Sequence, residues 1–357
     1  MEDLELYVVI MAGGRGRRLW PLSTPERPKQ FIDLNGSSLL KRTYDRISPM
    51  VRDERIIVVT GSGKGELVLE DLPNLPEANV IEEPVGKNTA PCIGLAAALS
   101  EKLLGLTEDR SVMAVLPADH FVKREERFRK LLENAARVAY DKKRLITLGI
   151  DPTRAATGYG YIEAGEGLSG EAEARDVISF TEKPDRKTAE EFLAAGNYYW
   201  NSGTFIWRTD TLLEGMEKHM PDLYDGLERI KAAAGTSDEA ETIAREYENF
   251  SGTSIDYGLM EKADNRGVLP VSVGWSDLGD WTSFRKLLES DEDGNNCYGE
   301  VTCRDSANNL VYSGTDKPVV GLGLEDVVVV DTSEALLVMD KSKAQEVKSV
   351  AREFEEK

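Results

Sequence analysis

Apolar runs alternate with helix-like periodicities along the first 150 residues of the chain. Runs typical of buried strands lie at 6–11, 55–60, 79–82, 112–116 and 144–149. Amphipathic patterns between these runs predict helices near 37–48, 63–70, 88–104 and 125–141. Because strands that alternate with helices form parallel β-α-β units, this part of the chain predicts an α/β fold.

The rest of the chain changes character at residue 291. Before this point, predicted strands at 159–164, 175–181, 203–208 and 268–273 mix with helices near 186–195, 210–219, 237–249 and 279–289. Beyond it, short β-rich runs separated by Gly, Asn and Asp turns reach residue 340, and an amphipathic helix is expected over 342–357. We therefore predict a larger domain over 1–290 and a small β-rich domain with a terminal helix over 291–357.

A glycine-rich turn directly follows the first predicted strand. Its glycines are Gly13, Gly14 and Gly16, and the cations that follow within fifteen residues are Arg15, Arg17, Arg18, Arg27 and Lys29. Such a turn brings backbone N–H groups close to an anion, and the basic side chains supply the charge that a polyphosphate requires. The turn lacks the third glycine of the dinucleotide fingerprint, and the chain contains no P-loop sequence. The segment predicts a nucleoside triphosphate site, with a plain tight turn as the alternative.

Composition narrows the classes of partner. The 357 residues include 44 basic and 64 acidic side chains, and the resulting net charge of −20 argues against nucleic acid and anionic membranes as partners. No apolar stretch approaches the roughly 18 residues of a membrane span, and the N-terminal residues lack the features of a secretory signal. Three cysteines without paired spacing fit a reducing compartment, so we expect a cytoplasmic protein. Two histidines are too few to favour a histidine-based catalytic or metal site.

Several segments of the chain resemble one enzyme family. The string G-G-R-G-R-R-L-W-P-L-S…P-K-Q-F is similar to the signature of sugar nucleotidyltransferases, and in particular of mannose-1-phosphate guanylyltransferases. Further similar segments are EPVGKNTAP (83–91), VLPADH (115–120), GYGYIEAG (158–165), FTEKPD (180–185), YYWNSGTFIWR (198–208), SIDYGLMEKA (254–263) and VGWSDLGDW (273–281). The resemblance implies a doubly wound, Rossmann-like nucleotidyltransferase core with a small C-terminal β domain related to left-handed β-helices.

The resemblance also implies a reaction, in which α-D-mannose 1-phosphate and GTP give GDP-mannose and pyrophosphate. A sugar phosphate oxygen attacks the α-phosphorus in line, so the protein must supply positioning and neutralisation of negative charge rather than a nucleophile. The alternatives are a related transferase for another sugar or base, and an inactive nucleotide-sensing homologue. The inactive homologue would have lost charged residues that this chain retains at Arg17, Lys29, Asp119 and Asp277. The chain ends without the isomerase domain of many bacterial relatives, so we expect no isomerase activity.

The triphosphate is expected to lie on the glycine turn. Backbone N–H groups from Gly13 through Gly14 to Gly16 should hold it, together with Arg17 and Lys29 as the catalytic cations that stabilise the leaving pyrophosphate. Pro28 limits the wandering of the segment that carries Lys29.

The base is expected to lie on a second loop. Guanine presents its N1–H and N2–H₂ donors together, and Glu83 is the carboxylate expected to accept both, with an ordinary solvent-facing glutamate as the alternative. Strand alternation should turn Glu82 the other way. Asn88 and Thr89 lie where a helix N-cap and a nucleotide contact could coincide. If Glu83 does not read guanine, backbone groups near Ala12 or Thr89 are the next choice.

The sugar is expected to lie on segments that resemble the family's sugar-binding segments. Glu182, Asn201 and the backbone at Gly160 should bind the mannose hydroxyls, and Lys183 should pair with the 1-phosphate. An exposed pair at the end of a strand is the alternative for Glu182 and Lys183. Trp200 is expected to pack rather than to stack on the sugar.

A magnesium ion is expected at two aspartates that match the family's metal ligands. Asp119 and Asp277 both follow strand-like runs, and Mg²⁺ usually takes one or two carboxylates together with substrate phosphates. A helix N-cap is the alternative for Asp119 and a turn carboxylate for Asp277, whereas Asp280 is a neighbour that ranks lower. The expected partners are thus GTP, mannose 1-phosphate and Mg²⁺. The oligomeric state stays open, with a homodimer as one expectation.

Overall fold

The computed structural model describes residues 4–14, 16–33, 36–168 and 173–355, and these residues form two compact units. The first unit contains the chain up to Gly13 together with 43–118 and 122–275, and the second contains 14–42, 119–121 and 276–357. Arg15 of the basic cluster lies outside the described residues. The division predicted at residue 290 follows the order of the chain, whereas the units interleave. The reason is that the segment after the glycine turn packs with the C-terminal helix α10 (Val347–Glu355).

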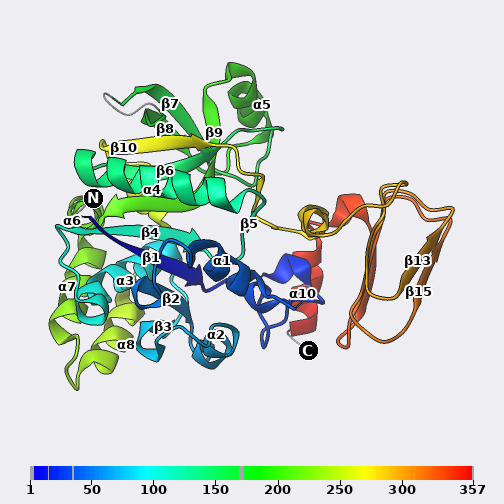
Figure 1. Cartoon of the computed structure of the whole chain (residues 1–357), viewed down its shortest axis with the longest axis horizontal. Helices are drawn as coiled ribbons and strands as arrows, with labels where there is room; N and C mark the ends of the chain where they lie inside the picture. Colours follow the sequence, from blue (N-terminus) through cyan, green and yellow to red (C-terminus); the bar gives the residue numbers. More distant parts are fainter. Residues whose placement is uncertain (1–3, 15, 34–35, 169–172, 356–357) are drawn as a thin grey trace. The chain divides into compact units, whose positions relative to one another are not determined.

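A nine-stranded sheet forms the centre of the first unit, in the order β3-β2-β1-β4-β9-β6-β10-β8-β7 (Figure 1). Its strands are β1 (Glu5–Ala12), β2 (Ile56–Gly61), β3 (Val80–Glu83), β4 (Ser111–Pro117), β6 (Leu145–Ile150), β7 (Tyr161–Gly167), β8 (Arg175–Thr181), β9 (Tyr198–Arg208) and β10 (Arg266–Val271). The four strands from β3 to β4 are mutually parallel. β9 pairs antiparallel with both β4 and β6, so the sheet is mixed.

Helices cover both faces of this sheet (Figure 1). α3 (Thr89–Leu104) packs on β1 and β2, whereas α4 (Glu125–Lys142) packs on β4, β6 and β9. Tyr7 and Val9 of β1 share a core cluster with α3, and the alternating residues Val8 and Ile10 are also fully buried. Because side chains alternate between the faces of a strand, this burial requires cover on both sides. The doubly wound α/β core expected from the sequence is confirmed.

One helix of the first unit has no counterpart in the prediction from sequence. α7 (Pro221–Ala233) begins with a proline, which a first helical turn accepts, and it buries Leu223, Leu227 and Ile230 at helical spacing. The other helices of the unit are α2 (Gly65–Asp71), α5 (Arg186–Ala195), α6 (Thr209–His219) and α8 (Glu239–Asn249), and α1 (Leu39–Ile47) carries the chain in from the second unit.

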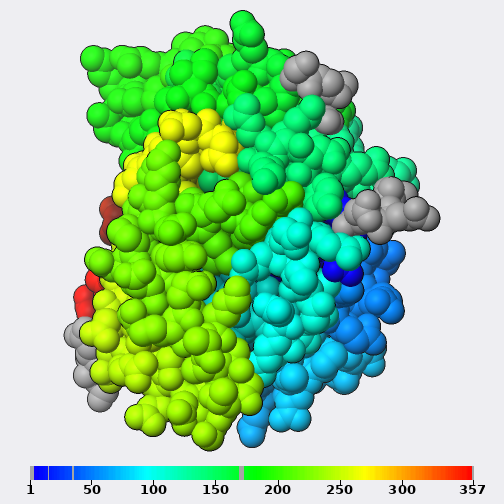
Figure 2. All heavy atoms as spheres, turned by 90° about the vertical axis from the view of Figure 1, so that its left-hand side faces the viewer, coloured from blue at the N-terminus to red at the C-terminus, as the bar shows by residue number. Residues whose placement is uncertain are grey.

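α7 and α8 lie beside the end of α3. In Figure 2 their yellow-green surface adjoins the cyan residues near 100–110. An ion pair of 2.6 Å joins Lys102 Nζ to Glu239 Oε2, and Lys231 pairs with Glu108.

Among the described residues, no helix combines the length and the apolar composition that crossing a membrane requires.

The second unit combines the glycine-turn segment with the C-terminal β domain. β12 (Asn296–Tyr298), β14 (Leu310–Ser313) and β16 (Val327–Asp331) are parallel, β17 (Leu336–Asp340) runs antiparallel to β16, and β13 (Val301–Arg304) pairs in parallel with β15 (Val319–Leu322). The unit also includes η1 (Arg17–Leu19), η2 (Lys29–Phe31), α9 (Trp281–Phe284), η6 (Arg285–Leu287) and η7 (Lys341–Lys343). The short strands β5 (Phe121–Val122) and β11 (Trp275–Ser276) pair with each other. Stacked parallel strands of this length agree with the predicted β-helix.

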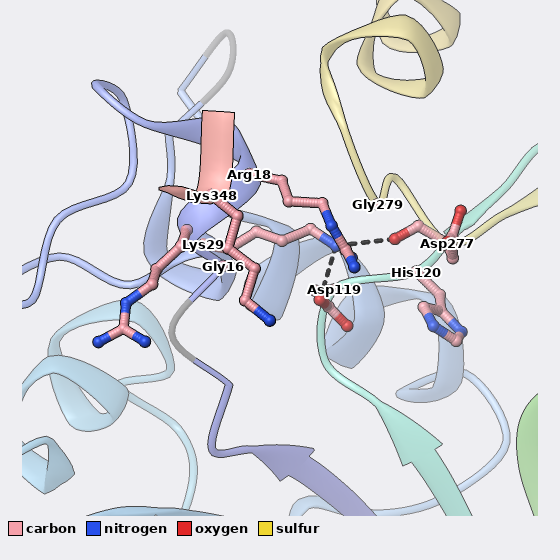
Figure 3. A pocket seen from close by; sticks show the side chains of 9 residues that line it. Gly16, Arg18, Lys29, Asp119, His120, Asp277, Gly279 and Lys348 are labelled. Atoms are coloured by element: carbon pink, nitrogen blue, oxygen red, sulfur yellow. Dashed lines mark hydrogen bonds and ion pairs between the residues drawn. The ribbon is translucent and has the colours of Figure 1, made fainter. Parts of the chain in front are cut away.

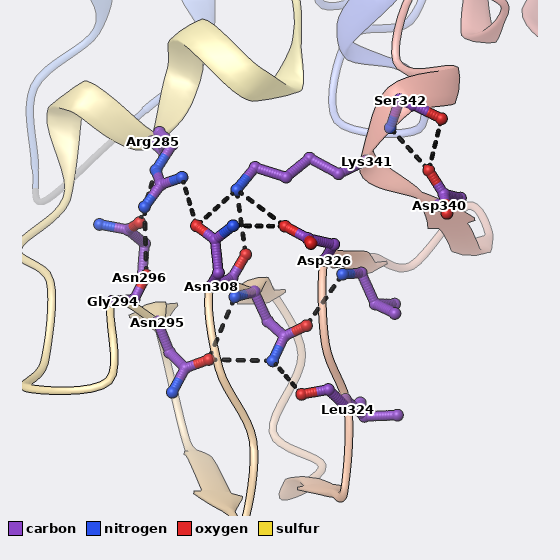
Figure 4. A network of polar contacts seen from close by, with 12 residues as sticks. Arg285, Gly294, Asn295, Asn296, Asn308, Leu324, Asp326, Asp340, Lys341 and Ser342 are labelled. Carbon is purple, nitrogen blue, oxygen red and sulfur yellow. Dashed lines mark hydrogen bonds and ion pairs between the residues drawn. The ribbon is translucent and has the colours of Figure 1, made fainter.

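Asparagine side chains connect successive turns of this β domain (Figure 4). Asn309 Nδ2 donates to Asn295 Oδ1 at 2.9 Å, and Asn309 Oδ1 accepts from the backbone N–H of Val327 at 2.9 Å. Lys341 Nζ donates to the backbone oxygen of Asn308 at 3.0 Å. Because buried polar groups need partners, this network satisfies the backbone at the turns and fixes their stacking.

Candidate active site

Nine residues of the second unit line a pocket of about 390 Å³ (Figure 3). They are Gly16, Arg17, Arg18, Lys29, Asp119, His120, Asp277, Gly279 and Lys348. The pocket therefore brings together five residues that the sequence singled out for the triphosphate and the metal. It also contains Arg18, which the sequence counted in the basic cluster, and three residues to which no prediction assigned a role, His120, Gly279 and Lys348.

Gly16 shapes the wall of this pocket. Its backbone is left-handed, with φ at 65°, and its carbonyl oxygen accepts a hydrogen bond of 2.8 Å from Ser23 Oγ. A Cβ atom at this position would lie 2.1 Å from Lys29 Cβ, so both the conformation and the space require glycine. The close approach brings the backbone of the glycine turn against the stem of Lys29.

Lys29 holds the two predicted metal ligands in one place. Its Nζ donates to Asp119 Oδ2 at 2.7 Å and to the backbone oxygen of Asp277 at 2.7 Å, and its side chain is only 7% exposed. Burial is the largest single influence on the pKa of Asp119 and raises it, but the charges of Lys29 and His120 and the hydrogen bonds to the carboxylate together outweigh burial and lower this pKa. Asp119 is thus held as a carboxylate.

The position of Asp119 excludes the helix N-cap that the sequence left open as its alternative, whereas the turn alternative for Asp277 stays open. Asp119 follows β4 and does not cap α4, whose N-cap is Arg124. Asp280 caps α9 through a hydrogen bond of 2.9 Å from the backbone N–H of Ser283, which agrees with its lower rank. The Asp277 carboxylate lies against Gly279, where a Cβ atom would come within 2.5 Å of Oδ2.

The donor set of this pocket fits a magnesium ion. Across the described residues, no group of three or more His, Cys, Asp and Glu side chains could hold a metal ion. Two carboxylates are nevertheless the protein share that Mg²⁺ usually takes when substrate phosphates supply further oxygen ligands. Asp119 and Asp277 match this chemistry.

Arg17 has a different neighbour from the one that the sequence suggested. Its guanidinium lies on the pocket and forms an ion pair with Glu355 of α10, with Nη2 and Oε2 2.6 Å apart. The prediction that Arg17 binds the triphosphate stays a prediction. The pairing shows that the C-terminal helix reaches the segment after the glycine turn.

Glu83 lies in the first unit at the end of β3 and is 4% exposed. The hydroxyl of Tyr247 donates to its Oε1 at 3.2 Å, and Oε2 accepts no hydrogen bond from any described residue. Oε2 lies 3.4 Å from the place of a Cβ atom at Gly13. Burial raises the pKa of Glu83 to about 7, although the Tyr247 hydrogen bond opposes this change. Glu83 is therefore not an ordinary solvent-facing glutamate.

The neighbours of Glu83 also agree with the pattern of the strand. Glu82 is exposed and accepts hydrogen bonds of 2.7 Å from the backbone N–H groups of Gly63 and Gly65, so it points away from Glu83 as expected. Asn88 caps α3 by accepting from the backbone N–H of Thr89 at 2.9 Å. The N-cap interpretation of Asn88 is confirmed, and the nucleotide contacts of Asn88 and Thr89 stay predictions.

The backbone of the glycine turn and of the strand before it carries the three remaining predicted contacts, at Ala12, Gly13 and Gly14. The carbonyl oxygen of Ala12 accepts from Thr60 Oγ1 at 3.1 Å. Gly14 is exposed, and no atom lies within 4 Å of the place of its Cβ. Contact of Ala12, Gly13 and Gly14 with a nucleotide stays a prediction.

The four predicted sugar residues meet in the first unit. A Cβ atom at Gly160 would lie 2.4 Å from Glu182 Oε2, and the backbone N–H of Asn201 donates to the oxygen of Gly160 at 2.8 Å. Glu182 forms an ion pair with Lys183, in which the Glu182 side chain is 8% and the Lys183 side chain 58% exposed. Lys183 has a left-handed backbone with φ at 49°. The pair therefore combines a buried carboxylate with an accessible ammonium group, and Trp200 packs in the core as expected.

Asp256 joins this group although the sequence did not single it out. It begins the π-helix η5 (Asp256–Met260), and its Oδ1 accepts from Asn201 Nδ2 at 2.8 Å. Burial and the charge of Glu182 raise the pKa of Asp256 to about 6. Single turns of π-helix are frequent at functional sites, and a buried carboxylate with a perturbed pKa points the same way.

The comparison with known proteins decides the family. The family model for "Nucleotidyl transferase" matches residues 7–294, and a model for the "MannoseP isomerase/GMP-like beta-helix domain" matches residues 299–354. The chain belongs to the nucleotidyl transferase family. The second match confirms the C-terminal β-helix.

Full-length relatives make the likeness more specific. A mannose-1-phosphate guanylyltransferase of Escherichia coli K12 is 38% identical over 99% of this chain and 74% of that enzyme, and one of Salmonella muenchen is 39% identical over 97% and 72%. A solved structure described as a mannose-1-phosphate geranyltransferase from Thermus thermophilus is 33% identical, with a TM-score of 0.87 over 99% of this chain and 100% of that one. The resemblance to mannose-1-phosphate guanylyltransferases drawn from the sequence is confirmed.

Proposed function

We propose that this nucleotidyltransferase transfers GMP from GTP to α-D-mannose 1-phosphate and releases pyrophosphate. A phosphate oxygen of mannose 1-phosphate forms the new bond to the α-phosphorus of GTP, and the bond from that phosphorus to the bridging oxygen of pyrophosphate breaks. The observation that carries the proposal is the pocket in which Gly16, Lys29, Asp119 and Asp277 meet, in a chain similar over its whole length to enzymes named for this reaction.

The residues of the pocket would act mainly through charge. Lys29, Arg17 and the backbone of the glycine turn would stabilise the negative charge on the leaving pyrophosphate. Asp119 and Asp277 would hold Mg²⁺, which when bound supplies positive charge to the phosphates. No protein nucleophile is required, because the sugar phosphate itself attacks.

The residues of the first unit would select the substrates. Glu83 would accept the N1–H and N2–H₂ donors of guanine through a carboxylate that is buried and has an unused oxygen among the described contacts. Glu182, Asn201 and the backbone at Gly160 would bind the sugar hydroxyls, and the exposed Lys183 ammonium would pair with the 1-phosphate. A base without both donors leaves the Glu83 carboxylate unpaired, which costs affinity.

The experiment that tests the proposal measures pyrophosphate release with each of the four NTPs combined with mannose, glucose and other sugar 1-phosphates in the presence of Mg²⁺. GTP with mannose 1-phosphate should give the highest kcat/KM. A higher value for another pair would select the related transferase, and no release with any pair, by a protein that still binds GTP, would select the nucleotide-sensing homologue. Location in the cytoplasm and assembly as a homodimer remain predictions from sequence.

A further inference from the structure

We propose that Lys348 of the C-terminal helix is a phosphate-binding residue of the active site, which contacts the β- and γ-phosphates of GTP and the pyrophosphate product. The proposal deepens the proposed function and rests on it. It assigns the β-helix domain a direct part in binding substrate, in addition to any part in folding.

The first observation is the place of Lys348. Lys348 is the second residue of α10, is exposed, and lines the same pocket as Lys29, Asp119 and Asp277. Figure 3 shows its side chain extending from the helix into this pocket, toward the Asp119 carboxylate. The glycine turn contributes Gly16 to the same lining.

The second observation is the fixed seat of the helix. Val347 and Ala351 are buried in the core cluster of the second unit, and the ring of Phe354 lies 4.9 Å from that of Trp20. These positions follow helical spacing, so one face of α10 is anchored. Lys348 and Glu355 are seven residues apart and therefore share another face, about 10 Å apart along the helix axis.

Glu355 shows what this second face contacts. It binds Arg17 at the end of the glycine-turn segment through Nε at 2.9 Å and Nη2 at 2.6 Å. One end of the face thus fixes the helix to the phosphate-binding segment, and the other end presents Lys348 to the pocket. Lys348 is held in position rather than placed there by a flexible tail.

The third observation is the balance of charge. Lys29 is already bound to Asp119 and to the Asp277 backbone, and Arg17 is bound to Glu355. Within the part of the chain that the structure describes, Arg18 and Lys348 form no ion pair. The pocket also contains the carboxylates of Asp119 and Asp277, but among the described contacts neither forms an ion pair with Arg18 or Lys348. Two cations that line one pocket without an ion pair repel each other, and an anion bound between them removes this cost. The leaving group of the proposed reaction is such an anion.

The test compares Lys348→Ala with Lys348→Arg and with the control Lys343→Ala. Lys343 precedes α10, is exposed, pairs with Glu346 at 2.7 Å and does not line the pocket. Initial rates are measured in both directions: GTP with mannose 1-phosphate, and GDP-mannose with pyrophosphate. Loss of one charged contact to phosphate corresponds to roughly tenfold to a hundredfold.

The expected result is a rise of this size in KM for GTP and for pyrophosphate in Lys348→Ala. KM for mannose 1-phosphate and for GDP-mannose should stay within about twofold of the wild-type values, Lys348→Arg should recover most of the loss, and Lys343→Ala should match the wild type. Unchanged KM values for pyrophosphate and GTP would overturn the proposal, and so would a selective rise for mannose 1-phosphate.

A binding measurement separates this proposal from the proposed function. Calorimetry with pyrophosphate and Mg²⁺ should show weaker binding to Lys348→Ala by the same factor, even if the wild type transfers no GMP to mannose 1-phosphate. Wild-type binding that survives the substitution unchanged contradicts the role of Lys348. Wild-type binding without transfer contradicts only the reaction.

Discussion

Replacement of Glu83 by Gln should increase the stability of the protein at high pH and have little effect at low pH. Burial raises the pKa of Glu83 from 4.5 to about 7 in the folded chain. Below 4.5 both the folded and the unfolded chain carry the proton, and stability from this group is fully present. As the pH rises through 7, the folded chain must ionise a buried carboxylate and this stability is lost.

The size of the effect follows from the same values. The difference between 4.5 and about 7 corresponds to about 3 kcal/mol. Gln has nearly the same shape as Glu and does not titrate, so the variant does not lose this stability as the pH rises. In the absence of nucleotide, Glu83→Gln should therefore gain about 2 to 3 kcal/mol over the wild type between pH 5 and pH 9.

The assay is urea unfolding of both proteins at pH 5, 7 and 9. The matched control is Glu82→Gln, which changes an exposed carboxylate one residue away and should show no such gain. The effect on activity should be opposite to the effect on stability, because only the carboxylate accepts both guanine donors. Glu83→Gln should therefore lower kcat/KM for GTP. It should also reduce the ratio of kcat/KM for GTP to that for ITP, which lacks the N2 amino group. A stability difference that does not change with pH, or one that favours the wild type at pH 9, would refute the reasoning.

Four further substitutions test other parts of the site. Asp119→Asn and Asp277→Asn should each lower kcat by orders of magnitude with an unchanged circular dichroism spectrum; a normal Mg²⁺-dependent rate in either would exclude it as a metal ligand. Lys183→Ala should raise KM for mannose 1-phosphate about tenfold and leave KM for GTP unchanged, because the substitution removes one charged contact to the 1-phosphate. Equal rises in KM for mannose 1-phosphate and for GTP would contradict a specific contact of Lys183 with the sugar 1-phosphate. Gly16→Ala should lower the melting temperature and weaken GTP binding, because a Cβ atom there would meet Lys29 Cβ at 2.1 Å in a left-handed backbone; wild-type stability would show that the turn can adjust.

The sequence predicts the core of this fold because periodicity and burial agree there. The strand predicted over 6–11 lies within β1, and the helix predicted over 186–195 matches α5. β9 begins at Tyr198 rather than at residue 203, because Gly203, with a left-handed φ of 69°, interrupts the apolar pattern without ending the strand. The sequence does not predict α7 although its buried residues have helical spacing, because charged and glycine residues lie between them.

The site was predictable where one short segment carries the chemistry. The glycine turn, Lys29 and the two aspartates fall on such segments, and the structure brings them to one pocket. Tyr247, Asp256 and Lys348 were not predicted, because each acquires its meaning from a partner far away in the chain. Asp256 lies in the segment 254–263, which resembles a segment of the enzyme family. This resemblance is the one signal in the sequence that could have identified Asp256. Nothing local distinguishes Lys348 from the other lysines of the terminal segment.

The most direct test of the central claim is ³¹P NMR of the protein with GTP, mannose 1-phosphate and Mg²⁺. Direct attack of the sugar phosphate on the α-phosphorus predicts that the signals of GTP and mannose 1-phosphate decrease together, while those of GDP-mannose and pyrophosphate appear in equal amounts. Formation of GDP or GMP with an unchanged mannose 1-phosphate signal would contradict the account.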